Sequence, residues 1–195
     1  MFKNYLKKKS KIGLAVDAAI VILFILLLIP ATRKEVAALI LKPTLFIHQP
    51  KVNNNKPIIS DNAYDWKLQN LAGEKIKLST FENNVLIINL WATWCPPCIA
   101  EMPDLQRLYN DYGDKVSFLF VSNESDATIK EFIDKKGYTF PVYTPLTQYP
   151  NDFETNTIPT TYIISKKGEL VINKTGVAQW NSKRIRQILD VLINQ

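Results

Sequence analysis

The chain has 195 residues, of which 47% are hydrophobic and 22% are charged. A domain usually takes ~100–200 residues, so this length fits one globular domain with an appendage and excludes a multidomain assembly. The net charge is +6, but the first 50 residues hold eight of the 24 basic and two of the 18 acidic side chains, which accounts for the whole excess. The remainder is neutral, so nucleic-acid binding has no electrostatic basis.

Residues 12–29 form an apolar run whose one charged residue is Asp17. A helix needs ~17–25 such residues to cross a bilayer. Five lysines precede the run, so the positive-inside rule keeps the N-terminus in the cytoplasm. We interpret residues 1–11 as a basic cytoplasmic N-terminus and residues 12–30 as an uncleaved transmembrane signal anchor. The alternative is a cleaved secretory signal, which has a shorter apolar core and small residues at its cleavage site. Both interpretations place the rest of the chain outside the cytoplasm.

Residues 31–57 are predicted to connect this anchor to the domain. Val36, Leu39 and Ile40 fall near one face of a helix, which fits a helix lying on the membrane surface. A hydrophobic connector packed on the domain fits the same pattern equally well. Residues 50–57 are polar with a proline at each end, as is typical of a linker. The globular domain is therefore expected at residues 58–195.

Patterns typical of strands and helices alternate through this domain. The sequence predicts a hairpin over residues 66–71 and 75–78, buried strands at 85–91 and 116–121, and a helix at 97–112 interrupted early by Pro103. It then predicts a helix at 126–136 between Ser125 and Gly137, a strand or extended chain at 138–143, a second hairpin at 160–164 and 170–173, and a last helix capped by Asn181 that ends at Ile193. This order describes an α/β fold with a central mixed sheet flanked by helices.

The two cysteines, Cys95 and Cys98, lie where the first buried strand ends and a helix begins. A disulfide-stapled scaffold would need more cysteine pairs, so these two either form a functional site or have no special role. The unpaired N–H groups at a helix N-terminus favour a thiolate at the first cysteine, which makes Cys95 the better nucleophile of the two. Cys98 is then placed to attack the mixed disulfide formed by Cys95. Pro96 and Pro97 stiffen the turn between the two cysteines.

The segment Trp94-Cys95-Pro96-Pro97-Cys98 after a buried strand resembles the active site of thioredoxin-like proteins. Further segments resemble the membrane-anchored TlpA and ResA branch: the anchor, the lead-in Asn-Leu-Trp-Ala-Thr-Trp, Cys98-Ile-Ala-Glu101-Met-Pro103 and Ile158-Pro159-Thr-Thr-Tyr. The resemblance covers about residues 58–195 and implies a thioredoxin-like fold with an N-terminal hairpin extension.

The same resemblance implies roles for residues outside the cysteine pair. Pro159 matches the cis proline that lies beside the disulfide, and the backbone at Ile158 would pair with the substrate chain. Trp94 and Pro97 are expected to border the bound substrate, whereas Trp91 is expected in the core.

Glu101 is the third candidate catalytic residue. General thioredoxins carry a buried aspartate six residues before the first cysteine, but here that position is Asn89, which cannot take a proton and is expected to be a hydrogen-bonded core residue. In the TlpA and ResA branch, a glutamate three residues after the second cysteine is thought to manage the proton, and Glu101 occupies this position. Residues at i and i+3 share a helix face, so Glu101 could accept the proton of Cys98, and desolvation would raise its pKa. Taken without the resemblance, a solvated first-turn glutamate is the alternative.

Other kinds of site are disfavoured. A structural zinc needs four ligands, which two cysteines and the distant His48 cannot supply, and no glycine-rich phosphate loop is present. We expect no metal and no cofactor other than the redox-active disulfide itself.

The resemblance implies a thiol-disulfide oxidoreductase in the bacterial cytoplasmic membrane with its domain on the periplasmic side. It favours reduction of disulfides in exported proteins, for example in cytochrome c biogenesis, with electrons from a transmembrane thiol donor of the CcdA or DsbD kind. The alternatives are an oxidant of folding exported proteins, a peroxide-reducing redoxin and a non-catalytic binding module. A peroxidase would want a threonine upstream of its attacking cysteine and an arginine to polarise the peroxide, whereas the aligned segment here is of the Trp-Cys-Pro-Pro-Cys type. The intact cysteine pair argues against a pure binder.

Overall fold

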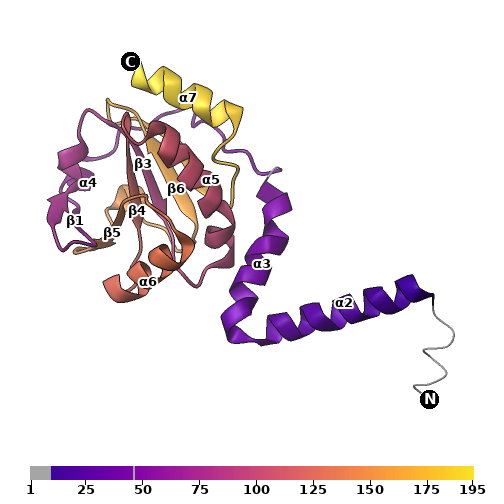
Figure 1. Cartoon of the computed structure of the whole chain (residues 1–195). Helices are drawn as coiled ribbons and strands as arrows, with labels where there is room; N and C mark the ends of the chain where they lie inside the picture. Colours follow the sequence, from indigo (N-terminus) through magenta and orange to yellow (C-terminus); the bar gives the residue numbers. More distant parts are fainter. Residues whose placement is uncertain (1–9, 46) are drawn as a thin grey trace.

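The computed structural model describes residues 10–45 and 47–195 (Figure 1). Most of the expected basic N-terminus, residues 1–9, lies outside the described residues. The apolar run forms α2 (Lys11–Leu28), which Ser10 caps by accepting a hydrogen bond from the N–H of Gly13. Within the described part of the chain, α2 is the one helix whose length and composition would let it cross a membrane, and none of its residues is buried. It is therefore a candidate membrane anchor.

The next helix, α3 (Pro30–Leu45), packs on the globular domain beside α5 (Pro96–Tyr112), as Figure 1 shows. Ala38 and Leu45 are buried, and Ala38 belongs to the same apolar cluster as Ile99 of α5. Of the two interpretations of this segment, the structure supports the packed connector. The expected linker at residues 50–57 is also attached to the domain, because the N–H of Asn53 donates to the carbonyl of Val171 at 2.7 Å.

The centre of the domain is a seven-stranded mixed sheet in the order β2-β1-β5-β4-β3-β6-β7. The strands are β1 (Lys67–Asn70), β2 (Lys75–Lys77), β3 (Val85–Leu90), β4 (Val116–Val121), β5 (Val142–Pro145), β6 (Thr160–Ile164) and β7 (Leu170–Thr175). Strands β3, β4 and β5 run parallel, and antiparallel hairpins form both edges, β1–β2 on one side and β6–β7 on the other. The predicted mixed sheet and N-terminal hairpin are both confirmed.

Alternation along the strands sends apolar side chains to two cores. The remaining helices are α4 (Asp61–Tyr64), α6 (Asp126–Lys136), α7 (Lys183–Ile193) and the 3-10 turns η1 (Leu78–Phe81) and η2 (Asn151–Phe153). Ile87 of β3 lies in one core with side chains of α5, α6 and α7. Its neighbours Leu86 and Ile88 lie in the other core with side chains of α4, η1 and η2. All six residues of β3 are buried, as expected of a central strand covered on both faces.

Three local predictions need correction. The last helix is capped by Ser182, whose Oγ accepts from the N–H of Ile185, while Asn181 instead accepts hydrogen bonds from Arg186. Pro103 does not interrupt α5, which is continuous over 17 residues because the turns around the proline are buried in the core. The extended segment after Gly137 becomes a strand only at β5. Ser125 and Gly137 bound α6 as predicted, with Gly137 at a left-handed φ of 66°.

Candidate active site

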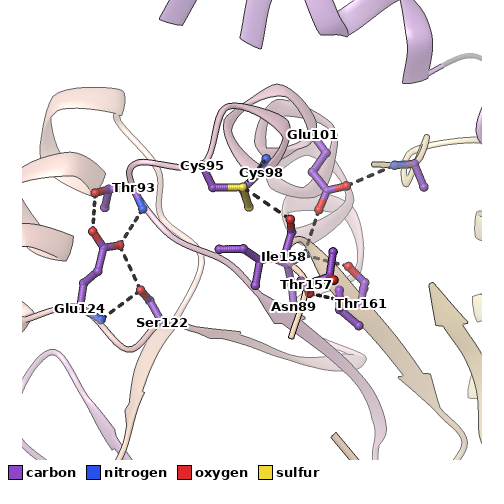
Figure 2. Close-up of a disulfide and its surroundings, with 12 residues drawn as sticks. Asn89, Thr93, Cys95, Cys98, Glu101, Ser122, Glu124, Thr157, Ile158 and Thr161 are labelled. Atoms are coloured by element: carbon purple, nitrogen blue, oxygen red, sulfur yellow. Dashed lines mark hydrogen bonds between the residues drawn. A yellow bond between two sulfur atoms is a disulfide. The ribbon is translucent and has the colours of Figure 1, made fainter. Parts of the chain in front are cut away.

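The cysteine pair lies at the start of α5, directly after β3, the central strand (Figure 2). Cys95 and Cys98 form a disulfide with their Cα atoms 5.3 Å apart, and both residues are buried. Cys95 is the N-cap of α5, and its Sγ accepts a hydrogen bond from the N–H of Cys98 at 3.2 Å. The first-turn N–H groups and the positive end of the helix dipole therefore point at the Cys95 sulfur, which favours a thiolate there once the disulfide is reduced.

Residues 158–159 face the disulfide from the start of β6. The Ile158–Pro159 peptide bond is cis, as expected, and Pro159 is buried. The carbonyl oxygen of Ile158 lies 3.8 Å from the Sγ of Cys95. Trp94 is 64% exposed and Pro97 is half-buried. The structure thus brings all the residues expected to border the substrate to the cysteine pair.

A hollow of about 260 Å³ opens beside this edge of the site. Its walls include Trp94, Ile158, Glu124, Tyr149 and Thr155. The last two belong to the irregular segment between β5 and β6, which the sequence leaves without a predicted structure. Tyr149 is fixed there by a hydrogen bond from its hydroxyl to Asn123 at 2.8 Å. An extended chain lying against Ile158 would have room in this hollow for one side chain next to its cysteine.

Glu101 is buried one turn after Cys98 on α5, with only 1% of its surface exposed. Its Oε1 accepts a hydrogen bond from Asn89 Nδ2 at 3.0 Å, and the same amide donates to Thr161 Oγ1 at 2.8 Å. Its Oε2 accepts from the backbone N–H of Ala178 at 3.2 Å and from the indole N–H of Trp180 at 3.0 Å. Glu101 is therefore no solvated first-turn residue, and Asn89 is the hydrogen-bonded core residue that the sequence predicts.

Burial decides the protonation of this carboxyl group. Desolvation raises the pKa of Glu101 to about 8, although hydrogen bonds from Trp180, Asn89 and Ala178 and the charge of Lys174 all act in the opposite direction. The net shift has the direction expected for a carboxyl group held away from water. A group that titrates near neutral pH can both accept and return a proton under physiological conditions.

A second carboxylate holds the loop that precedes the cysteines. Glu124, just after β4, accepts hydrogen bonds from the backbone N–H of Thr93 at 2.6 Å, from the Thr93 hydroxyl at 2.7 Å and from the Ser122 hydroxyl at 3.1 Å (Figure 2). The sequence predicts neither the hydrogen bonds between Glu124 and Thr93 nor the hydrogen bond from Trp180 to Glu101. Neither has a local signal, because the partners lie 31 and 79 residues apart in the chain.

The described residues contain no group of three or more His, Cys, Asp or Glu side chains that could hold a metal ion. The reactive groups that the structure brings together here are the two sulfur atoms and the neighbouring buried carboxyl group.

The family model for the AhpC/TSA family matches residues 59–172. The chain belongs to this family. Thioredoxin-like protein YneN of Bacillus subtilis is 34% identical over 133 residues, which are 66% of this chain and 77% of that protein. Thiol-disulfide oxidoreductase ResA of Halalkalibacterium halodurans is 34% identical over 119 residues, 60% of this chain and 68% of that protein.

Solved structures of thioredoxin-type proteins are similar in fold to this chain. The exposed lipoprotein thioredoxin Etrx1 of Streptococcus pneumoniae has a TM-score of 0.54 at 26% identity, covering 66% of this chain and 99% of that one. A thioredoxin-family thiol:disulfide interchange protein of Chlorobium tepidum, at 20% identity and a TM-score of 0.54, covers 75% of this chain and 97% of that one, and supports the fold. The chain is thus a thioredoxin-fold thiol-disulfide oxidoreductase of the ResA type, as its resemblance implies.

Proposed function

We propose that this protein is a membrane-anchored, extracytoplasmic reductase of disulfides in exported proteins. The observation that carries the proposal is the pairing of a helix-capping sulfur at Cys95 with a buried carboxyl group, Glu101, one turn beyond Cys98. The first feature supplies a nucleophile, and the second supplies a proton acceptor for the other thiol. The ResA relatives support the type of reaction, and α2 supports the anchor.

Substrate docking comes first in this mechanism. The backbone at Ile158, which precedes the cis proline Pro159, pairs with an extended stretch of the substrate as an added strand would. Because the Ile158 carbonyl lies 3.8 Å from the Cys95 sulfur, a chain paired there presents its own disulfide to Cys95. Trp94 and Pro97 flank the same edge, and the neighbouring hollow receives an adjacent side chain.

The exchange itself takes two displacements. The Cys95 thiolate attacks one substrate sulfur, so that a mixed disulfide forms and the other substrate sulfur leaves as a thiolate that takes up a proton. Cys98 then attacks Cys95, the substrate's second sulfur leaves, and the Cys95–Cys98 disulfide remains. The substrate gains two electrons and two protons, and the protein loses the same number.

Glu101 serves the second displacement. Cys98 is buried and must lose its proton before it can attack, and Glu101 is the carboxyl group on the same face of α5. Because the pKa of Glu101 is raised to about 8, it is basic enough to take that proton, which a carboxylate of ordinary pKa is not.

Return to the dithiol state requires an electron donor. In an oxidising compartment, we propose a membrane thiol carrier of the CcdA or DsbD kind, whose dithiol becomes a disulfide as Cys95 and Cys98 are reduced. Haem-binding cysteines of apocytochrome c are the proposed substrates. Oxidation of folding proteins is the competing function, because the same two displacements run in either direction and the reduction potential decides between them.

The deciding measurement is the reduction potential of the Cys95–Cys98 pair in the full chain, held in mild detergent and equilibrated with dithiothreitol or glutathione couples. A potential near about −270 mV supports a reductase, and a value near about −120 mV would make the protein an oxidant. The Glu101→Gln variant is measured in parallel over a range of pH. An unchanged pH dependence and exchange rate in this variant would remove Glu101 from the mechanism.

A further inference from the structure

The corner between α2 and α3 is closed by hydrogen bonds. One residue, Ile29, separates the two helices. The hydroxyl of Thr32 donates to the carbonyl of Leu26 at 2.6 Å, and the backbone N–H of Arg33 donates to the carbonyl of Ile29 at 3.0 Å. The candidate anchor therefore continues into α3 without a flexible spacer.

The first turns of α3 contact the active-site loop directly. Lys34 Nζ donates to the carbonyl of Thr93 at 3.2 Å, two residues before Cys95. The same ammonium group lies 5.7 Å from the ring centroid of Phe132. Glu35, the next residue, forms an ion pair with Lys136 of α6. These contacts attach the membrane-proximal end of α3 to the end of the domain that carries the disulfide.

The path from Ile29 through Lys34 and Thr93 to Cys95 limits the distance between the disulfide and the end of the anchor. Five helical residues from Ile29 to Lys34 rise about 7.5 Å. The lysine side chain spans roughly 6 Å, its hydrogen bond to Thr93 adds 3.2 Å, and two further residues lead to Cys95 at ~3.8 Å each. With the C=O and Cα–C bonds of Thr93 included, Cys95 lies within about 30 Å of Ile29, whatever the angle between α2 and α3.

Without this docking, the limit would be far longer. Residues 30–57 would form a free tether, and 28 residues can extend to roughly 90 Å. A domain on such a tether could turn its active site in any direction. The buried side chains of Ala38 and Leu45 and the polar contacts of Lys34 and Glu35 are what exclude that freedom.

We propose that α3 is a bracket that holds the Cys95–Cys98 site on the membrane-facing side of the domain, within reach of the membrane-embedded dithiol donor proposed above. The inference rests on the proposed function in taking α2 as the membrane anchor. The donor's two thiols become one disulfide, the Cys95–Cys98 disulfide becomes two thiols, and two electrons and two protons pass between them.

The first test measures how deep the site lies, with the full chain reconstituted in phospholipid vesicles. A bimane fluorophore is placed at Trp94→Cys or at Lys167→Cys, each in a Cys95→Ser, Cys98→Ser background. Lys167 is exposed in the β6–β7 turn, beyond the end of β6 far from the disulfide. We expect lipids with nitroxide headgroups to quench the label at position 94 several-fold more than the label at position 167.

The bracket is then loosened. The double variant Lys34→Met, Glu35→Gln removes both polar contacts of the first turns of α3, and we expect quenching at position 94 to fall toward that at position 167. Lys42→Met is the matched control, because it removes a charge from the same helix about 12 Å away, two turns beyond Lys34, and we expect no change. Equal quenching at both positions, or no response to the double variant, would overturn the bracket.

The second test uses active protein and measures reduction of the Cys95–Cys98 disulfide by a phospholipid carrying a dihydrolipoyl headgroup and by soluble dithiothreitol. The ratio of the two rates should fall several-fold in the double variant and stay unchanged in the Lys42→Met control. An unchanged ratio in the double variant counts against the bracket. Failure of the protein to float with vesicles would instead refute the anchor, and an oxidising potential would refute the reductase while leaving the quenching result intact.

Discussion

Replacement of Glu101 by glutamine tests the electrostatics of the site through protein stability. The carboxyl group is buried, and its pKa is raised from 4.5 to about 8 in the folded protein. Between these two values the folded protein keeps a proton that the unfolded chain has lost. The unfolded state binds fewer protons in this window, so stability falls as the pH rises from about 5 to about 8 and levels off above it.

The size of this loss of stability follows from the same linkage between proton binding and folding. Each pH unit inside the window costs about 1.4 kcal/mol of stability, so the loss between pH 5 and pH 8 sums to roughly 3–4 kcal/mol. Glu101→Gln carries no titrating group and should lack this slope. Glutamine at position 101 can also keep the hydrogen bonds of this carboxyl group. Its Oε1 accepts from Ala178 and Trp180, and its NH2 group faces Asn89, whose side-chain amide can rotate so that its oxygen accepts from that NH2 group.

The assay is urea unfolding of the oxidised full chain in mild detergent at pH 5, 6, 7 and 8, with Glu131→Gln on the exposed surface of α6 as the matched control. The control should keep the wild-type pH dependence. If Glu101→Gln and wild type gave parallel curves, the pKa of Glu101 would not be raised in the folded protein, and the proton-acceptor role argued from that raised pKa would be wrong.

Three further outcomes are expected. Cys98→Ser should trap a mixed disulfide with a protein substrate at Cys95, visible on a non-reducing gel, whereas rapid release of substrate would show that Cys98 is not the resolving thiol. Trp180→Phe removes one donor to the ionised form of Glu101, so in urea unfolding it should cost about 1.5–3 kcal/mol at pH 9 and less at pH 5; an equal cost at both values would mean that only packing is lost. Ser125→Ala should destabilise the protein by about 1 kcal/mol in the same assay through loss of the α6 N-cap, and an unchanged midpoint would contradict the cap.

The parts of the fold that the sequence predicts are those with a local cause. The run at β3 is apolar at nearly every position because both of its faces are buried, and the α6 boundaries follow from a capping serine and a left-handed glycine. The sequence cannot choose between Asn181 and Ser182 as the cap of α7, because both residue types can cap a helix and they are adjacent. In the structure the Asn181 side chain accepts hydrogen bonds from Arg186, and Ser182 is the cap.

The site was predictable in its contiguous part and at Ile158 and Pro159, which only the family resemblance connects to the cysteines. Cys95, Cys98 and Glu101 share one helix, so spacing and the family resemblance place them together. Two of the hydrogen-bond donors to Glu101 come from the segment before α7, and the groups that hold Thr93 come from the loop after β4 and from α3. Such contacts depend on how the elements pack, and no periodicity in the sequence records them.

The contact between Asn89 and Glu101 explains why an asparagine suits position 89. Its Nδ2 lies 3.0 Å from Glu101 Oε1, so an aspartate there would face a second carboxyl group across a buried contact. Two carboxyl groups at that distance cannot both ionise, and one would keep a proton well above neutral pH. Asn89 removes this competition and donates a hydrogen bond that favours the ionised form of Glu101. In the mechanism proposed above, the proton acceptor lies on the cysteine-bearing helix and not on the central strand, and an amide at position 89 is compatible with that arrangement.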